Sequence, residues 1–407
     1  MKKLNIGIIR EGKIPSDSRA PLSPQQCRQL LDQHSQIAIF VQPSPHRCYA
    51  DDEYRSIGIP MQDDLSHCDI LMGVKEVPVD QLLPEKKYLF FSHTIKEQPY
   101  NQKLMWALLD KGIQMIDYEC LVDDQYKRIL GFGHFAGVVG AHNGLLAYGK
   151  KTATFDLKPA YLCKDFAEIK QHYAQLQLPP IKIVLTGNGR VSTGAKEVLD
   201  ILQIQEVSPH DFLHQEYPHP VYTQLVSKDL YRHCSTNIYD RNDFHAHPDQ
   251  YRSSFAPYTR VTDLMMNGVY WAADCPPFFT KDEMKAADFC IKVIADISCD
   301  IEGSIPATLR ATRIGDPVMG YNPHTEQEEA PYQAHTIDIM AVDNLPNELP
   351  RDATEQFGAA LSRYIIPELL QPNSTVIDRA TITLQGKLHG RFQYLEHYAA
   401  KPTYHIS

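Results

Sequence analysis

The stretch IKIVLTGNGRVSTGAKEVLDIL, residues 181–202, decides the fold of this chain. It begins with an apolar run typical of a buried strand, continues into a glycine-containing turn and ends with helical periodicity. Gly187 permits the tight turn, Gly189 lets the backbone approach a pyrophosphate at the helix N-terminus, and Gly194 with Ala195 lets the helix pack closely on the sheet. Because the spacing is G-x-G-x-x-x-x-G rather than G-x-G-x-x-G, a purely structural turn remains an alternative to a dinucleotide-binding turn.

The segment after this helix bears on which dinucleotide would bind. In such sites an acidic side chain about 20 residues further on takes the ribose hydroxyls. Ser208 stands at the expected strand end, and a serine there removes one source of repulsion against a 2′-phosphate. The sequence therefore leans toward NADP(H) over NAD(H), although Glu206 and Asp211 lie close enough to bind the ribose instead.

Short apolar runs alternate with helical segments on both sides of this motif. Strands are expected at 4–9, 37–41, 70–74, 88–92, 113–117, 292–297 and 336–342, and helices at 24–33, 101–111, 164–177 and 353–369, with a helical and peripheral C-terminal end. The alternation predicts an α/β fold of two Rossmann-like domains whose parallel sheets flank a central cleft. We expect a catalytic domain of residues 1–135 completed by about 346–407, and a dinucleotide-binding domain of residues 136–345. The Tyr-, His- and Asp-rich residues 210–258 are expected to be an insertion rather than a sheet element.

Composition narrows the class of protein. The 407 residues allow two or three domains, and 43% apolar with 22% charged residues is ordinary globular usage. A formal charge of −10 argues against a nucleic-acid partner and favours small-molecule partners. Because no signal-peptide pattern and no membrane-spanning run is present, we expect a cytoplasmic protein without a membrane partner. The nine cysteines form no C-x-x-C pair, and among the histidines of residues 210–247 only His245 and His247 have a spacing that suggests a metal clasp. Because no cysteine pair joins them, no metal site is expected.

Three side chains suited to acid–base or anion chemistry occupy loops in the first part of the chain. Lys75 follows the strand at 70–74, His93 follows the strand at 88–92, and Arg19 follows a glycine-containing loop. The carboxyl ends of neighbouring parallel strands converge at one edge of a sheet. We therefore expect a carboxylate-binding, proton-transferring site there, with exposed surface residues as the alternative.

Several segments resemble one enzyme family. KKYLFFSHTIKEQ at 86–98 resembles a strand-end segment of the lysine-ketoglutarate reductase half of aminoadipic semialdehyde synthase. Residues 73–75, 186–192, 295–300 and 342–346 resemble the same family in the same order, and the resemblance runs from Arg10 to about Gly358. More distantly, the chain is similar to fungal saccharopine dehydrogenase (lysine-forming) and to the alanine dehydrogenase and transhydrogenase superfamily.

The resemblance implies reductive condensation of L-lysine with 2-oxoglutarate to saccharopine with NAD(P)H, or its reversal. Lys75 and His93 match the family's acid/base pair, and a lysine serves in that role only if burial or nearby positive charge lowers its pKa. The remaining matches are Arg19 and Arg128 as carboxylate-binding arginines, Gln98 as a substrate contact, Phe132, Ser298 and Asp300 as pocket residues, Glu76 and Glu119 as residues that tune the pair, and Gly189, Arg190, Tyr270 and Asp343 as dinucleotide contacts beside Gly187 and Ser208. Ser208 and Gly268 depart from the fungal NAD enzymes, which have an aspartate and a cysteine there.

A saccharopine-forming, NAD(P)-dependent oxidoreductase of lysine metabolism is thus the leading hypothesis. A related amino-acid dehydrogenase such as alanine dehydrogenase, which reduces an imine made from ammonia, is the first alternative. A non-catalytic dinucleotide-binding protein is the second, although such a protein has no need of Lys75 and His93. The sequence leaves the direction of the reaction, NAD against NADP and the oligomeric state open.

Overall fold

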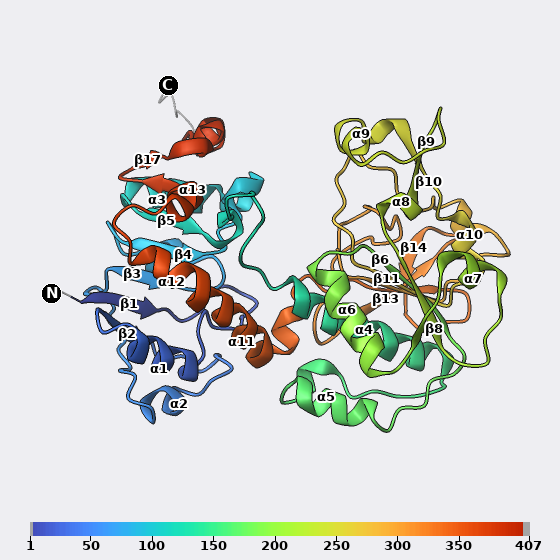
Figure 1. Ribbon diagram of the computed structural model, residues 1–407, viewed down its shortest axis with the longest axis horizontal. Helices are drawn as coiled ribbons and strands as arrows, with labels where there is room; N and C mark the ends of the chain where they lie inside the picture. The colour runs from blue at the N-terminus through green and yellow to red at the C-terminus, as the bar shows by residue number, and fades with distance from the viewer. Residues whose placement is uncertain (1–2, 402–407) are drawn as a thin grey trace. The chain divides into compact units, whose positions relative to one another are not determined.

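A computed structural model describes residues 3–401 of the chain, which divides into two compact units. Unit 1 contains the residues up to Gly131 and those from Pro350 onward, and unit 2 is Phe132–Leu349. Each unit is built on one large, mostly parallel sheet with helices around it (Figure 1). Among the described residues, no helix has the length and apolar character needed to cross a membrane.

Unit 1 has a seven-stranded sheet of order β17-β16-β5-β4-β3-β1-β2. Its strands are β1 (Leu4–Ile8), β2 (Ile37–Val41), β3 (Ile70–Met72), β4 (Lys87–Phe90), β5 (Gln114–Asp117), β16 (Thr381–Leu384) and β17 (Lys387–Leu388). Strands β1 to β5 are parallel, as predicted, whereas β16 pairs antiparallel with β5. The expectation of a helical, peripheral C-terminal end is therefore wrong for residues 381–388, because the β-branched run Thr-Ile-Thr extends the sheet.

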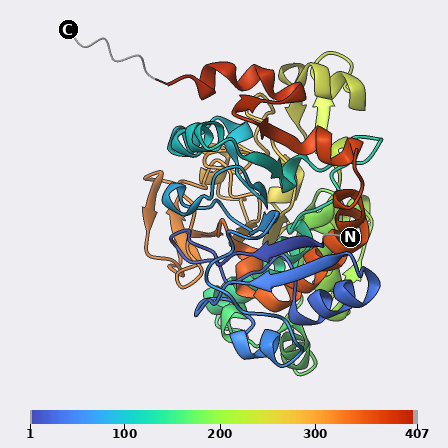
Figure 2. The same ribbon diagram turned by 90° about the vertical axis from the view of Figure 1, so that its left-hand side faces the viewer.

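The helices of unit 1 lie around its sheet (Figure 1). They are α1 (Pro24–Gln33), α2 (Asp51–Arg55), α3 (Gln102–Asp110), α11 (Pro350–Ala360), α12 (Ile366–Leu369), α13 (Thr375–Ala380) and α14 (Glu396–Ala399). Ser23 caps α1, and the side-chain amide of Gln26 donates to the Glu355 carbonyl, which joins α1 to α11. The strands β1 and β2 and the helix α1 face the viewer in Figure 2. The helix expected at 353–369 contains a π-helical turn at Leu361–Ile365, just before Pro367, whose ring cannot fit a regular α-helical turn.

Unit 2 has an eight-stranded sheet of order β14-β13-β15-β12-β11-β6-β8-β7. Its strands are β6 (Lys182–Thr186), β7 (Gln205–Glu206), β8 (Val221–Leu225), β11 (Leu264–Asn267), β12 (Val293–Asp296), β13 (Val318–Asn322), β14 (Gln327–Glu329) and β15 (Ile337–Met340). The six strands from β15 to β7 are parallel, and β13 and β14 complete the edge in antiparallel pairs. The apolar side chains of the central strands β6, β11 and β12 are almost completely buried, as expected for strands covered on both faces.

The predicted insertion at 210–258 contains a strand of this sheet, so the expectation is wrong for residues 221–225. Strand β8 lies between β6 and β7, and four of its five residues are buried. Its β-branched and aromatic residues fit a pleated, buried surface despite the polar composition around them. The rest of the range holds the short pair β9 (Tyr231–His233) and β10 (Tyr251–Ser253) and the helices α7 (Pro209–His214), α8 (Ser227–Leu230), α9 (Arg241–Ala246) and α10 (Ala256–Thr259).

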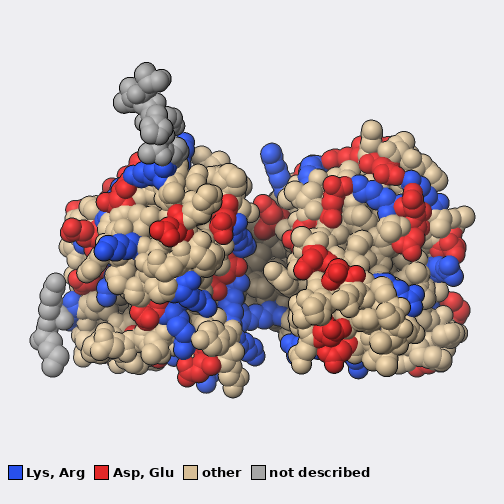
Figure 3. Space-filling model, turned by 90° about the horizontal axis from the view of Figure 1, so that it is seen from above, with Lys and Arg blue, Asp and Glu red and all other residues tan. Residues whose placement is uncertain are grey.

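Two long helices of unit 2, α4 (Gly133–Thr152) and α6 (Arg190–Ile201), lie side by side (Figure 1), while α5 (Phe166–Tyr173) is a separate short helix. A Cβ at Gly137 would overlap the Val191 carbonyl, and a Cβ at Gly194 would overlap the His134 carbonyl. Gly194 therefore serves close packing of two helices, which corrects the prediction that it packs α6 on the sheet. Acidic and basic side chains are interspersed over the face of each unit seen in Figure 3.

Candidate active site

The polar residues of unit 1 gather after the carboxyl ends of four neighbouring parallel strands. Glu11 follows β1, Lys75 and Glu76 follow β3, His93 follows β4, and Glu119 follows β5. Two of these side chains meet directly, because His93 Nδ1 lies 2.6 Å from Glu76 Oε1. The structure thus brings a predicted proton-transfer residue into contact with the acidic residue predicted to tune it.

Glu76 forms the centre of a small charged network. Its other oxygen accepts a hydrogen bond of 2.8 Å from Lys13 Nζ. Burial acts to raise the pKa of Glu76, but the hydrogen bonds from His93 and Lys13 lower it to about 2. His93 has a left-handed backbone with φ 52° and its ring stacks on Phe91 at 6.3 Å between centroids. Glu76 is therefore a carboxylate at neutral pH, and it orients the His93 ring.

Lys75 lies at the edge of the same network. Burial lowers the pKa of its ammonium group, and the nearby charge of Arg19 lowers it further. The backbone N–H groups of Val74 and Lys75 donate to the two oxygens of Glu11 at 2.6 and 2.8 Å, which fixes the chain where it leaves β3. Burial and a neighbouring cation are the two features that favour the neutral, basic form of a lysine.

Sequence reasoning missed Glu11 and Asp17. Asp17 and Arg19 form a pair with exposures of 2% and 4%, in which Arg19 Nε and Nη2 lie 2.9 and 2.6 Å from the two carboxylate oxygens. Burial raises the pKa of Glu11 to about 7. The sequence signal for Glu11 was its position just after an apolar strand, and the signal for Asp17 was its spacing of two residues from Arg19. Neither signal by itself indicates that the side chain is buried. The bidentate pair holds the predicted carboxylate-binding Arg19 in one orientation.

The other predicted residues of unit 1 lie around Glu119. Its Oε1 is 3.4 Å from Arg128 Nη1 and 3.8 Å from Lys96 Nζ, so in the described residues its ion pairs are with these two cations rather than with His93. The Arg128 guanidinium lies 5.4 Å from the centroid of the Phe91 ring. Gln98 accepts a hydrogen bond of 2.7 Å from the Tyr100 hydroxyl.

In unit 2, the glycine turn joins β6 to α6 as predicted. Gly187 has φ +90°, which only glycine adopts readily, and a Cβ there would lie 2.8 Å from Ser192 Oγ. Gly189 is the N-cap of α6, and a Cβ there would meet no atom within 4 Å. The space beside Gly189 is thus open, as a pyrophosphate approaching the backbone requires.

A pocket of about 460 Å³ opens at this turn. Its lining comes from the turn itself, the carboxyl end of β8, the α9 region and the segment after β11: Gly187, Asn188, Gly189, Val226, Ser227, Lys228, Tyr239, Arg241, His245, Gly268, Val269 and Tyr270. The predicted cofactor residue Tyr270 belongs to this lining and is 95% exposed. Arg190 begins α6 directly after the turn.

Ser208 follows a strand, β7, as predicted, but it does not line this pocket. The strand that lies beside β6 is β8, whereas β7, which precedes Ser208, is at the sheet edge beyond β8. Ser208 is instead the N-cap of α7, where its hydroxyl accepts from the Asp211 N–H at 3.1 Å. Val226, Ser227 and Lys228 follow β8, the strand next to β6.

The remaining predicted residues of unit 2 follow neighbouring elements. Ser298 donates to Asp296 Oδ1 at 2.7 Å within a buried network, and burial raises the pKa of Asp296. Asp300 follows two residues later, Asp343 is exposed after β15, and Phe132 is the N-cap of α4. Because β11, β12 and β15 are neighbouring parallel strands, Ser298 and Asp343 follow the same sheet edge as the glycine turn.

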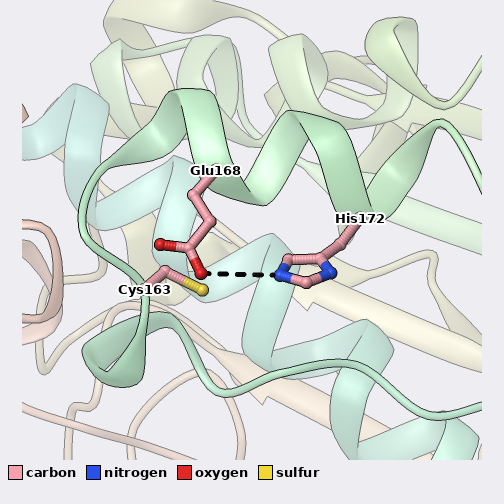
Figure 4. Close-up of side chains that lie close together, drawn as sticks. All are labelled: Cys163, Glu168 and His172. Carbon is pink, nitrogen blue, oxygen red and sulfur yellow. Dashed lines mark ion pairs between the residues drawn. The ribbon is translucent and has the colours of Figure 1, made fainter.

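One group in the described residues has metal-ligand chemistry that the sequence analysis did not single out. Donor atoms of Cys163, Glu168 and His172 lie within 4.8 Å of one another, on and just before α5 (Figure 4). Both Glu168 oxygens already accept from protein donors, with Lys158 Nζ at 2.5 Å and the Lys164 N–H at 2.7 Å. We interpret this group as a hydrogen-bonded start of α5.

Comparisons with known proteins agree with this architecture. Residues 7–139 match the family described as "Alanine dehydrogenase/PNT, N-terminal domain". An alpha-aminoadipic semialdehyde synthase of Arabidopsis thaliana is 30% identical over 96% of this chain and 41% of its own length, and a saccharopine dehydrogenase (NAD(+), L-lysine-forming) of Emericella nidulans is 22% identical over 89% of this chain and 91% of its own length. A solved L-alanine dehydrogenase is 15% identical with a TM-score of 0.66 and covers 97% of this chain and 100% of its own. The chain spans less than half the length of the Arabidopsis relative, and its likeness to the alanine dehydrogenase concerns the fold alone.

Proposed function

We propose a function for this chain from the premise that its residues 7–139 belong to the alanine dehydrogenase/PNT N-terminal domain family. The protein is an oxidoreductase that forms saccharopine from L-lysine and 2-oxoglutarate with a reduced nicotinamide dinucleotide. The amine of lysine attacks the keto carbon, water leaves, and hydride reduces the resulting imine. The relatives named for saccharopine and aminoadipic semialdehyde chemistry support this assignment.

The contact between His93 and Glu76 beside Lys75 is the observation that carries the proposal. Formation of the imine needs a base that takes a proton from the lysine ammonium and an acid that protonates the departing hydroxyl. Lys75 is suited to be the base, because burial and Arg19 lower its pKa. His93 is suited to be the acid, because the Glu76 carboxylate at 2.6 Å from Nδ1 holds its imidazole ring in one orientation.

Cationic and amide side chains would bind the substrate carboxylates. Arg128 presents a guanidinium group, which can recognise a carboxylate through paired hydrogen bonds, and Gln98 offers an amide. Arg19, whose Nε and Nη2 already pair with Asp17, would add positive charge to the site. Phe132, Ser298 and Asp300 of unit 2 are further proposed substrate contacts, while Glu119 would adjust the charge around Arg128. These roles follow the family pattern residue by residue.

The cofactor is NAD(H) or NADP(H), and its nicotinamide supplies or accepts the hydride when bound. The residues of unit 2 fit such a group, because the backbone at Gly189 faces open space and a pocket of about 460 Å³ lies beside it. Gly187, Gly189, Arg190, Tyr270 and Asp343 are the proposed contacts. We propose NADP(H) as the preferred form, because the pocket lining includes two cationic side chains and no carboxylate.

A nicotinamide-oxidation assay tests the proposal. We expect turnover with lysine plus 2-oxoglutarate that exceeds turnover with ammonia plus pyruvate by at least about 100-fold. Greater turnover with ammonia and pyruvate would assign the chain to amino-acid dehydrogenation instead. No turnover in either mixture, with dinucleotide binding retained, would favour a non-catalytic dinucleotide-binding protein.

A further inference from the structure

The charged side chains that line the pocket at the glycine turn are all positive, which hydride transfer by itself does not require. Of the described residues that line it, Lys228 and Arg241 are cationic and none is an aspartate or glutamate. Dinucleotide sites that bind a free ribose diol commonly use a carboxylate for this purpose, and sites that bind a 2′-phosphate use an arginine. We propose that Lys228 and Arg241 form the site for the 2′-phosphate of the adenosine ribose, an inference that rests on the proposed function.

The order of the strands brings Lys228 to the required position. In a dinucleotide fold the adenosine ribose lies beyond the strand next to the one that precedes the glycine turn. Here that strand is β8, which pairs with β6 from Val221 to Leu225. Residues 226–228 follow its carboxyl end and share the pocket with Gly187 and Gly189.

Arg241 reaches the same pocket from a different part of the chain. It is the first residue of α9, in the segment between β9 and β10, and His245 of the same helix also lines the pocket. Two cations from separate elements, β8–α8 and α9, therefore face one cavity. A phosphate dianion binds well between such groups, because an arginine fork and a lysine ammonium both donate charge-assisted hydrogen bonds.

Neither cation is neutralised by the protein. In residues 3–401, the side chains of Lys228 and Arg241 have no hydrogen-bond or ion-pair partner, although most other lysines and arginines of unit 2 have one. The acidic side chains nearest in sequence to these two cations accept hydrogen bonds from backbone N–H groups at helix starts. Asp229 Oδ2 accepts from the Val226 N–H at 3.0 Å, and Asp240 Oδ1 accepts from the Asn242 and Asp243 N–H groups at 2.9 Å. The positive charge is therefore available to a ligand.

Binding of two nucleotides to the full chain tests the inference without any turnover. The probes are adenosine 2′,5′-bisphosphate and adenosine 5′-monophosphate, measured by isothermal titration calorimetry. The unmodified protein should bind the bisphosphate at least about tenfold more tightly, because charge-assisted hydrogen bonds to the 2′-phosphate are gained. Lys228→Gln and Arg241→Gln should each weaken bisphosphate binding by about tenfold and leave monophosphate binding within twofold.

Two variants serve as matched controls. Arg252→Gln removes an exposed cation of the same segment whose guanidinium donates to Asn237, outside the pocket, and it should not change either affinity. Ser208→Asp adds a negative charge at the cap of α7, and it should also have no effect. Both Lys228 and Arg241 are exposed, so thermal unfolding of their variants should match that of the unmodified protein.

The outcomes separate this inference from the proposed function. Equal affinity for the two nucleotides, or equal losses for both in the two variants, would overturn the 2′-phosphate site. A shift of preference caused by Ser208→Asp alone would also overturn it. Selective bisphosphate binding without saccharopine formation would keep the site and overturn the proposed function, and no binding of either nucleotide would overturn both.

Discussion

The two glycines of the turn at residues 187–189 should respond to substitution in opposite ways. Gly189→Val is expected to abolish dinucleotide binding while the protein stays folded. Its backbone, with φ −83°, is accessible to any residue, and a Cβ meets nothing within 4 Å. The cost to stability is therefore only that of a poorer N-cap, at most about 1 kcal/mol.

The binding loss can be worked from the same geometry. Branched methyl groups at residue 189 would occupy the open space where the pyrophosphate meets the backbone N–H groups. Losing two charge-assisted hydrogen bonds at about 1.5 to 3 kcal/mol each corresponds to at least about 100-fold weaker binding. Fluorescence titration with NADPH and NADH measures this loss.

Gly187→Ala is the matched comparison. Its φ of +90° and the 2.8 and 3.0 Å distances from a Cβ to Ser192 Oγ and the Gly268 carbonyl predict a loss of about 2 to 4 kcal/mol in the free energy of unfolding. Urea denaturation of both variants gives the test. Unchanged dinucleotide affinity in Gly189→Val would show that the turn only connects β6 to α6, and a greater stability loss in Gly189→Val than in Gly187→Ala would refute the steric reasoning itself.

Four further substitutions test the remaining parts of the site and fold. Lys75→Met and His93→Gln should each lower kcat by about 100-fold or more without moving the unfolding transition, and normal turnover in either variant would remove that residue from the mechanism. Glu76 has a folded pKa of about 2, below its ordinary 4.5, so its carboxylate adds stability above pH 4.5 that is lost as the pH falls through about 2. The free energy of unfolding, measured by urea denaturation, should fall less between pH 6 and pH 2 in Glu76→Gln than in the unmodified protein, by up to about 3 kcal/mol. The same fall in both proteins would contradict the pairing of Glu76 with His93. Gly194→Ala should destabilise unit 2 by at least about 2 kcal/mol because its methyl overlaps the His134 carbonyl, whereas Gly315→Ala, which meets open space, should be neutral in the same measurement.

The regular elements of the fold are predictable where local signals agree. Helix α1 and strand β2 have the predicted bounds, because Ser23 and Pro24 mark a helix start and the apolar run at 37–41 is sharply limited. Strand β8 was missed because its β-branched run is short and is surrounded by histidine, tyrosine and proline. The order of strands is set by tertiary packing, so a single sequence could not show that β8 rather than β7 lies beside β6.

The same distinction applies to the candidate site. Lys75 and His93 were found because they follow apolar runs, and the parallel strands then bring Glu76 to His93. Glu11 and Asp17 were missed because burial of a charged side chain depends on residues distant in sequence, such as Val74 for Glu11. Lys228 was missed for a related reason, since its significance depends on the position of β8.

The close contact of α4 with α6 has a consequence for the motions of the cofactor site. At Gly137 and Gly194 the two helix backbones touch without an intervening side chain, and side-chain rotamer changes cannot loosen that contact. The N-terminal turn of α6, which begins at Arg190, is thereby held rigid before any ligand arrives. Binding a pyrophosphate there should cost little conformational entropy, so we expect association to be fast and amide hydrogen exchange in α6 to be slow in the free protein as well as in the complex.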